Sequence, residues 1–418
     1  MTTDKQRIYR AVVFSQILFT AGHSLTTGAF FNYFVYGFQP SAFVFAVLQI
    51  LPESAESLSW LTRWLLMVDG SRKRLWIAGV LIGRVCALGV PLALFLKDQQ
   101  LALVLIMIAT SLWYLCQGIA YVSYLSWLSD LVPETNWGEF FARRQIAMVV
   151  ISMLVPISAG LMRSYYLQEL NPSWQRWSYL LVFFTGAIVV VTSILPMLGI
   201  PDVGGELKAQ RHWFAGCRQL IADSNFRWFI ASRWWLAFFQ GLTQSVLFFF
   251  KVQYLKLSLE ASYGLLALML LLQITLTQLG GFLSDHGKDR SGFGWGIVIS
   301  ATGMFFLFLA TPEQWWWIIG TYVAWGAFGV VNLCGRNLCL KLAPLSDNTA
   351  QMTLYRQFSG LVAGLAGLWG GWWLGQLRPE GSVRLWPFYL LFAISIIGRS
   401  TAPLWLLLIK RVNHPHTT

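Results

Sequence analysis

Charged residues are scarce in this chain of 418 residues, of which Asp, Glu, Lys and Arg make up only 11%. A soluble domain carries roughly 25% charged residues, because its surface must be wetted. Hydrophobic residues reach 56%, and the mean hydropathy is +0.57. The composition therefore excludes an ordinary soluble enzyme or binding domain and indicates a membrane protein.

Cysteine and histidine are also few, at five each. Their spacing predicts neither a disulfide framework nor a metal site, and we expect no cofactor. The sequence has no Gly-rich loop ending in Gly-Lys-Ser/Thr, so ATP is not expected to drive the protein. No small-residue cleavage site follows the first apolar run, so we expect no cleaved signal peptide. These features argue against an enzyme.

Long apolar runs dominate instead, and each is about the length that crosses a ~30 Å hydrocarbon core as a helix. The runs are continuous rather than alternating, which predicts helices and excludes a membrane β-barrel. We predict an all-α polytopic membrane protein with twelve transmembrane helices. The predicted spans are 11–37, 42–68, 75–96, 101–128, 145–166, 177–200, 228–250, 262–284, 294–311, 315–341, 356–377 and 387–410.

The net charge of +12 is distributed unevenly over the predicted loops. If the N-terminus is cytoplasmic, twenty of the thirty Lys and Arg residues fall in cytoplasmic tails, loops and helix ends. This asymmetry predicts that both termini are cytoplasmic in a bacterial inner membrane. The basic excess therefore reflects topology and anionic lipid, and we expect no nucleic-acid partner.

Two sequence patterns recur about half a chain apart. Leu131-Val-Pro133 followed by Arg144-Gln145 recurs as Leu342-Ala-Pro344 followed by Arg356-Gln357, and Asp69-x-x-Arg72-x-Arg74 recurs as Asp285-x-x-Lys288-x-Arg290. The offsets of 211 to 216 residues indicate two duplicated bundles, which is the plan of a secondary transporter. We predict a six-helix bundle over residues 1–200, a cytoplasmic linker over 201–227, and a second bundle over 228–418. Part of the linker is expected to be an amphipathic helix.

This arrangement resembles the major facilitator superfamily. The basic pattern between spans two and three, repeated between spans eight and nine, is similar to the family's Gly-x-x-x-Asp-x-x-Gly-Arg-Arg/Lys motif, with Asp69 and Asp285 as its aspartates. The glycines depart from the motif, although Gly281 matches the leading glycine of the second copy. The resemblance implies two pseudo-symmetric bundles around a central cavity lined by spans one, four, seven and ten. Pro156-Ile-Ser-Ala159-Gly160 partly resembles the signature of proton-coupled exporters, which slightly favours export.

The charged loop residues are candidates for gating. A carboxylate near a helix end accepts charge-assisted hydrogen bonds that can hold one face of the two bundles closed. The candidates are Asp69, Arg72, Arg74, Asp130, Arg144, Asp285, Lys288, Arg290 and Arg356. The alternative is that these charges only set the topology.

Span two contains the only acidic residues predicted deep in the membrane, Glu53 and Glu56. With Gln49, Trp60 and Arg63 they lie on one helix face, which we expect to point into the bundle or a wet cavity. Neighbouring carboxyls raise each other's proton affinity, so this pair is a candidate for proton coupling. The alternative is a structural ion pair with Arg84 in span three.

Other polar residues in the spans suggest a solute cavity. His23 in span one is a candidate proton relay, or a hydrogen-bonding partner of a neighbouring helix. Arg233 is a candidate solute contact by the family resemblance, whereas Arg84 and Arg399 are interpreted as buried structural charges because spans three and twelve are peripheral there. The remaining cavity candidates are Asn32, Gln49, Tyr114, Gln117, Tyr121, Gln240, Gln244, Trp325 and Asn332. Ordinary interhelical packing is the alternative for the aromatic members.

The sequence therefore predicts a monomeric secondary transporter that moves a small organic solute by alternating access. A proton gradient is the favoured driving force, and sodium is the alternative. The arginines favour an anionic or zwitterionic solute, whereas the aromatic side chains suit a lipophilic one equally well. A non-transporting membrane scaffold or assembly factor on the same fold is the alternative function.

Overall fold

The computed structural model describes residues 3–57, 62, 64–66, 70–131, 137–167, 172–202, 213–342, 351, 353–377 and 384–410. This part of the chain consists of helices joined by short turns and contains no strands. Helices satisfy their own backbone hydrogen bonds, which is what an apolar run needs inside a bilayer. Each of the twelve predicted spans coincides with one or more of these helices. Nine helices in the described part are long and apolar enough to cross a membrane.

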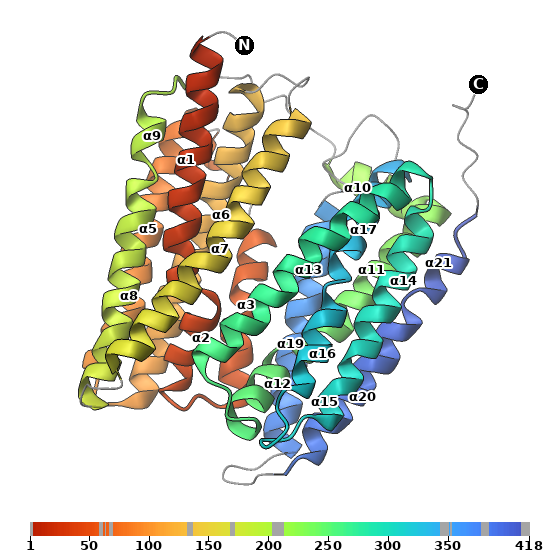
Figure 1. Cartoon of the computed structure of the whole chain (residues 1–418). Coiled ribbons are helices and arrows are strands. Elements are labelled where there is room, and N and C mark those ends of the chain that lie inside the picture. Colours follow the sequence, from red (N-terminus) through yellow and green to blue (C-terminus); the bar gives the residue numbers. More distant parts are fainter. Residues whose placement is uncertain are drawn as a thin grey trace. The chain divides into compact units, whose positions relative to one another are not determined.

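The first half of the chain contains α1 (Thr3–Thr26), α2 (Gly28–Tyr36), α3 (Ala42–Ser57), α5 (Arg72–Leu92), α6 (Gln99–Leu131), α7 (Trp137–Leu167), α8 (Pro172–Thr192) and α9 (Leu195–Leu198), with a 3-10 turn at Ala93–Phe95 (Figure 1). Helix α10 (Trp213–Ala222) follows. Its Cys217 and Leu220 are buried in the core of the second half, so this part of the predicted linker is a docked helix.

The second half contains α11 (Ser224–Leu242), α12 (Gln244–Phe249), α13 (Leu259–Asp285), α14 (Asp289–Thr302), α15 (Phe306–Leu309), α16 (Trp317–Trp325), α17 (Phe328–Lys341), α19 (Phe358–Leu377), α20 (Trp386–Thr401) and α21 (Leu404–Leu407). Short 3-10 or π-helical turns lie at Phe250–Tyr254, Gly303–Phe305 and Thr353–Gln357.

The chain divides into two compact units. Unit 1 comprises Met1–Pro40, Ala55–Leu207 and Ser258–Gly264, and unit 2 comprises Ser41–Ser54, Lys208–Leu257 and Leu265–Thr418. Each unit therefore includes a short segment from the other half of the sequence. In unit 2, Phe45 of α3 stacks on Phe248 of α12 with ring centroids 4.4 Å apart. In unit 1, the hydroxyl of Tyr263 in α13 accepts a 3.0 Å hydrogen bond from the backbone N–H of Phe30.

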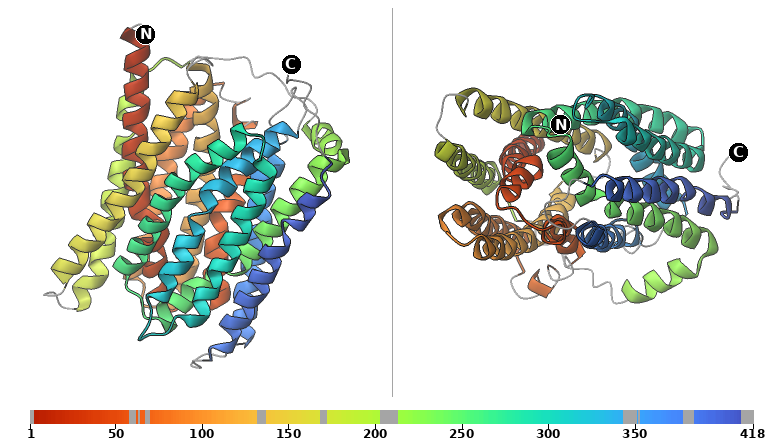
Figure 2. Two further views of the ribbon diagram at one scale, coloured as in Figure 1. Left: turned by 45° about the vertical axis from the view of Figure 1, so that its right-hand side comes forward. Right: turned by 90° about the horizontal axis from the view of Figure 1, so that it is seen from below.

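Within unit 1, α1 packs on α7 and α8, and α5 packs on α6 and α8 (Figure 2). Its core includes Trp76, Tyr124, Trp127 and Met197. Within unit 2, α11 packs on α19 and α20, and α14 packs on α17 and α20. The α11–α19 contact is so close that a Cβ on Gly370 would lie 2.0 Å from the carbonyl oxygen of Leu242. Small residues at membrane helix contacts permit this approach.

The duplication recurs in the backbone. Gln39 and Lys256 are left-handed, with φ of 50° and 53°, and so are Gly70 and Gly287, with φ of 69° and 67°. Both pairs lie 217 positions apart. The backbone therefore relates the two halves by an offset of 217 positions, which we call the 217-residue register, whereas the Asp-x-x-Arg/Lys pattern predicts 216. In the 217-residue register the equivalent of Lys288 is Ser71. The sequence pattern differed by one residue because it aligned the charged residues, whereas the conformation of the turn depends on the position of the glycine.

Candidate functional site

Two equivalent helices are interrupted within one residue of the same relative position. Helix α1 ends at Thr26, and α2 starts after an extended Thr27 at Gly28, which has a φ of +61°. Helix α11 ends at Leu242, and Thr243 separates it from α12. Thr26 and Thr243 also lie 217 positions apart. Interrupted helices in duplicated transporters leave backbone groups free near the solute site. The two breaks therefore mark candidate solute-binding regions.

A buried arginine binds the break in unit 1. Arg84 of α5 is 2% exposed, and its guanidinium donates to the hydroxyl of Thr26, to Nδ1 of His23 and to Oε1 of Gln117, each over 3.3 Å. The ring of Trp113 lies 5.1 Å from the guanidinium carbon. The structure thus gathers His23, Arg84 and Gln117, which the sequence assigned to three separate roles.

The chemistry of this cluster fixes the charge of His23. A guanidinium has only donors, so Nδ1 of His23 must accept and the imidazole must be neutral. Protonation would place two cations in contact inside an apolar bundle. The other polar neighbours of Arg84 in the described part, Thr26 and Gln117, are neutral, and Tyr114 interacts with it electrostatically.

A second buried arginine binds the break in unit 2. Arg399 of α20 is 4% exposed and donates to the hydroxyl of Thr243 over 2.9 Å and to the carbonyl of Phe239 over 3.4 Å. Ser395 donates to the same carbonyl over 2.7 Å. Arginine–threonine contacts therefore hold both breaks, although the arginines come from non-equivalent helices. We call these contacts the arginine staples.

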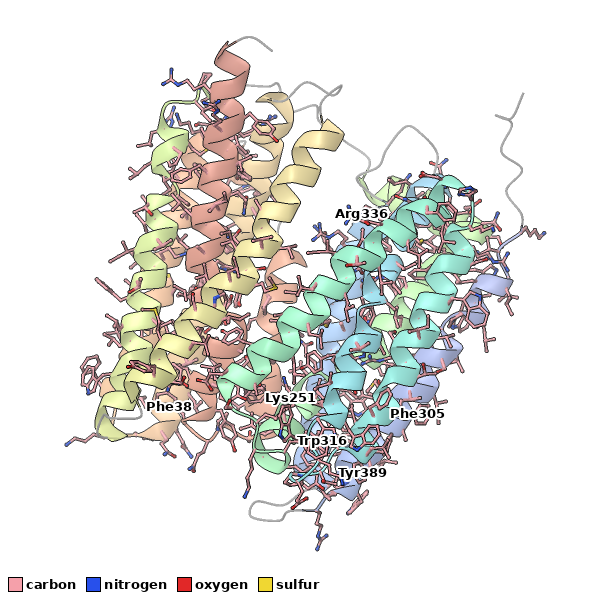
Figure 3. The ribbon with its side chains drawn as sticks, in the orientation of Figure 1. Phe38, Lys251, Phe305, Trp316, Arg336 and Tyr389 are labelled. Atoms are coloured by element: carbon pink, nitrogen blue, oxygen red, sulfur yellow. The ribbon has the colours of Figure 1, made fainter. Side chains whose placement is uncertain are left out.

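Arg233 of α11 lies elsewhere in unit 2. Its guanidinium carbon lies 5.2 Å from the centroid of the Tyr355 ring, and its Nε is buried with no hydrogen-bond partner in the described structure. Lys251, labelled in Figure 3 at the end of unit 2 opposite Arg336, donates to the Tyr322 hydroxyl over 3.1 Å. The sequence analysis missed this contact because Lys251 falls at the end of its predicted span.

The remaining cavity candidates differ in burial. Asn32, Gln49, Tyr114 and Gln240 are half-buried, whereas Tyr121, Gln244 and Asn332 are exposed. Trp325 is half-buried and donates from its indole N–H to the carbonyl of Ser300 over 3.2 Å. That bond ties α16 to α14, which is the packing role weighed for the aromatic residues.

The basic residues after the two left-handed glycines bind helix ends. Lys73 donates to the carbonyls of Leu198 and Ile200 over 2.7 and 2.6 Å, and Arg290 donates to the carbonyl of Ile409 over 3.0 Å. Cations are stabilising at helix C-termini, where carbonyl groups are free. Lys73 and Arg290 are 217 positions apart, so the same basic cap closes the last helix of each unit.

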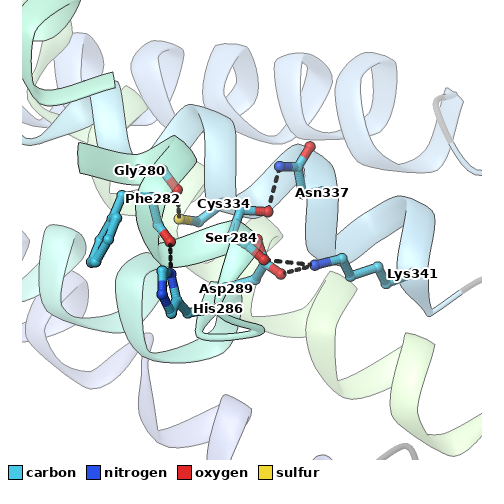
Figure 4. A network of polar contacts seen from close by, with 8 residues as sticks. All are labelled: Gly280, Phe282, Ser284, His286, Asp289, Cys334, Asn337 and Lys341. Atoms are coloured by element: carbon cyan, nitrogen blue, oxygen red, sulfur yellow. Dashed lines mark hydrogen bonds and ion pairs between the residues drawn. The ribbon is translucent and has the colours of Figure 1, made fainter. Parts of the chain in front are cut away.

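A buried carboxylate near the second turn belongs to Asp289, which the sequence analysis did not single out. Asp289 is 2% exposed, and its Oδ2 lies 2.5 Å from Nζ of Lys341 on α17 (Figure 4). Lys341 also donates to the carbonyl of Ser284 over 3.3 Å, and Asn337 donates to the Ser284 hydroxyl over 2.7 Å. In the 217-residue register Asp289 is the equivalent of Arg72, a residue of the charged pattern. That alignment would have identified Asp289 as a candidate.

The other gating candidates differ in burial. Asp285, Lys288, Arg74 and Arg356 are exposed, and Arg72 is buried. Asp69 and the side chains of Glu53, Glu56, Asp130 and Arg144 lie outside the described residues. The structure therefore leaves their predicted roles as predictions.

Comparison with known proteins identifies the class. The sequence model of the Major Facilitator Superfamily matches residues 12–367, and the chain belongs to this family. It is a multi-pass membrane transporter with the fold of that superfamily, and this membership points to a non-enzymatic protein. The comparison with curated protein sequences yields no match.

Solved structures of three transporters share the fold. A bacterial homologue of the iron transporter ferroportin in its inward-facing state has a TM-score of 0.69 and 14% identity, covering 97% of this chain and 99% of that chain. A D-xylose–proton symporter has a TM-score of 0.68 and 15% identity, covering 96% of each chain. A POT family transporter in complex with 5-aminolevulinic acid has a TM-score of 0.71 and 13% identity, covering 97% of each chain. At such identities the similarity establishes the fold alone.

Proposed function

We propose that this protein moves a small organic solute across the bacterial inner membrane by alternating access, driven by protons and in the direction of export. The observation that carries the proposal is the pair of breaks in equivalent helices, each bound by a buried arginine. A solute that contacts a break competes for backbone groups that the arginine staple otherwise orders. Solute binding and helix geometry are thereby linked within each unit.

Proton coupling is supported by the contact between His23 and Arg84. A neutral imidazole accepts from the guanidinium over 3.3 Å, and a proton on His23 removes that bond and adds repulsion. The staple at Thr26 then loses one of its supports. Glu53 and Glu56 are retained as coupling groups on the sequence argument, in which a carboxyl inside a bundle binds protons readily.

Gating is assigned to the charged turns. The candidates remain Asp69, Arg72, Arg74, Asp130, Arg144, Asp285, Lys288, Arg290 and Arg356. The ion pair between the buried Asp289 and the exposed Lys341 joins them. Exposed residues such as Asp285 and Lys288 are free to exchange partners during a cycle, whereas Lys73 and Arg290 serve as caps within their units. We retain the bundles at 1–200 and 228–418, the linker at 201–227 and cytoplasmic termini.

The test is proton movement in proteoliposomes with an internal pH-sensitive dye. A solute that drives proton flux in the unmodified protein, with the flux lost in Glu53→Gln, Glu56→Gln or His23→Gln, supports proton coupling. Flux that persists in all three variants contradicts it. A folded protein that moves no solute from a broad library contradicts transport and favours the scaffold. The variant Asp98→Asn, at an exposed position outside the predicted spans, is the matched control for loss of a charged carboxylate.

A further inference from the structure

Three arginines from separate parts of unit 2 converge on Tyr355. The guanidinium carbon of Arg233, on α11, lies 5.2 Å from the centre of its ring. The hydroxyl of Tyr355 reaches α17 at Gly335, where a Cβ would lie only 2.7 Å from it, and Arg336 is the next residue. Arg356 follows Tyr355 directly in the chain. All three guanidinium groups interact electrostatically with Tyr355.

The three charges lack a counter-charge in the part of unit 2 that the structure describes. No carboxylate there pairs with them, whereas Lys341, on the same helix as Arg336, is paired with Asp289. Nε of Arg233 is buried and has no hydrogen-bond partner among the residues that the structure describes. Neighbouring cations that are partly removed from water repel each other unless an anion lies between them.

Two of the three arginines, Arg233 and Arg336, are not part of the repeated architecture. Gly79 packs on Ala120 of α6, and its equivalent in the 217-residue register, Gly296, packs on Val331 of α17. Ala120 and Val331 are therefore equivalent, so residues of α6 and α17 correspond at an offset of 211 positions. At that offset Leu125 corresponds to Arg336, and at the 217-residue offset Gln16 corresponds to Arg233. Unit 1 folds with neutral residues at both positions. The fold of unit 2 therefore does not require the charges of Arg233 and Arg336, which indicates a role in binding, whereas Arg356 matches Arg144 in the repeat.

We propose that Arg233, Arg336 and Arg356 form an anion-binding site in unit 2, and that the transported solute is a small organic anion carrying a carboxylate or phosphate group. This inference rests on the proposed transport function. Guanidinium groups bind such oxyanions through paired hydrogen bonds, with a geometry that lysine lacks. Arg336 and Arg356 are exposed and accessible to a ligand, while Arg233 is half-buried and supplies a partly desolvated charge.

An apolar surface adjoins the charges. Trp234 stacks on Phe358 with ring centroids 5.8 Å apart, and its indole N–H donates to the carbonyl of Leu354 over 3.0 Å. Both aromatic residues are near the arginines in sequence. An anion with an aromatic or aliphatic body gains apolar contact there as well as charge pairing. We therefore expect benzoate to bind more tightly than inorganic phosphate.

The site is tested by thermal unfolding of the detergent-purified chain titrated with sodium benzoate, citrate or inorganic phosphate at constant ionic strength. We expect at least one of these anions to raise the unfolding temperature with a saturating dose dependence. Arg336→Gln and Arg356→Gln should each weaken the apparent affinity about 10- to 100-fold, since each removes a charge-assisted hydrogen bond. Arg336→Lys should retain part of it, and Arg218→Gln, at an exposed position on α10, should change nothing.

Two arms separate a solute from a lipid headgroup, because both carry the same oxyanion chemistry. In the second arm phosphatidylglycerol is added to the micelles in place of the soluble anions. Stabilisation by phosphatidylglycerol alone overturns the solute assignment, and so does an anion response that is equal in all variants. Arg336 and Arg356 are exposed, so their variants should fold even if Arg233→Gln does not.

Flux of radiolabelled benzoate into proteoliposomes distinguishes the two proposals. Binding that depends on the arginines without any flux supports the anion site and contradicts transport. Flux that is unaffected in Arg336→Gln and Arg356→Gln supports transport and overturns the site.

Discussion

The guanidinium of Arg399 donates to the hydroxyl of Thr243 over 2.9 Å, at the point where α11 gives way to α12. The acceptor belongs to the residue that interrupts the helix, and the donor comes from α20, 156 positions away. Because the contact is buried, its loss leaves the Arg399 guanidinium with only the longer 3.4 Å hydrogen bond to the Phe239 carbonyl in the described structure. The arginine staple therefore stabilises a break that the local sequence alone does not define.

The first prediction concerns this staple. Thr243→Val preserves the shape of the side chain but removes the acceptor, and should lower the free energy of unfolding by about 1.5–3 kcal/mol. Thr26→Val should have a smaller effect, because the Arg84–Thr26 contact is longer, at 3.3 Å. Thermal unfolding in detergent measures both. Thr302→Val on α14, whose hydroxyl is exposed, is the control, and equal effects at Thr243 and Thr302 would contradict the staple.

The second prediction concerns the ion pair of Asp289 and Lys341. Asp289→Asn should destabilise unit 2 by about 1–3 kcal/mol, because a buried carboxylate loses its charge while Lys341 keeps its own. The side chain of Lys341 is 37% exposed, so its charge is already partly hydrated in the folded state. Lys341→Met should therefore be less destabilising than Asp289→Asn through the lost charge itself. It does, however, leave the buried carboxylate of Asp289 unpaired. A double-mutant cycle on unfolding temperatures isolates the pair. Additive single effects would show that the pair contributes no coupling energy.

The third prediction uses two glycines of α19. In Gly370→Ala the new methyl group would lie 2.0 Å from the Leu242 carbonyl oxygen, a distance that real contacts do not reach. We expect α11 and α19 to be forced apart, with a loss of several degrees in unfolding temperature or a failure to fold. Gly375→Ala on the same helix meets no atom within 4 Å and should be neutral or slightly stabilising, because alanine favours helix. Similar unfolding temperatures for the two variants would refute the close contact.

The sequence predicted twelve helical spans from the length of its apolar runs, and each coincides with one or more helices of the described structure. It did not predict the breaks at Thr27 and Thr243, since Thr and Gly are common inside membrane helices and carry no strong stop signal. It identified His23, Arg84 and Gln117 separately, but their meeting depends on how α1, α5 and α6 pack. Asp289 was overlooked because the Asp-x-x-Arg/Lys pattern drew attention to Asp285, four residues before it.

The last prediction concerns acid. The folded chain holds His23 neutral beside Arg84, whereas an unfolded chain leaves its imidazole free to take up a proton. The unfolded state therefore binds more protons in mildly acidic solution, and stability should rise with pH across the range in which a free imidazole titrates. His23→Gln keeps an acceptor for Arg84 but does not titrate, so this variant should lose part of that pH dependence between about pH 5 and 8. His286→Gln, at an exposed position on the α13–α14 turn, is the matched control. Unfolding temperatures measured across this range decide the question, and parallel pH profiles for the unmodified chain and His23→Gln would remove His23 from the proposed proton path.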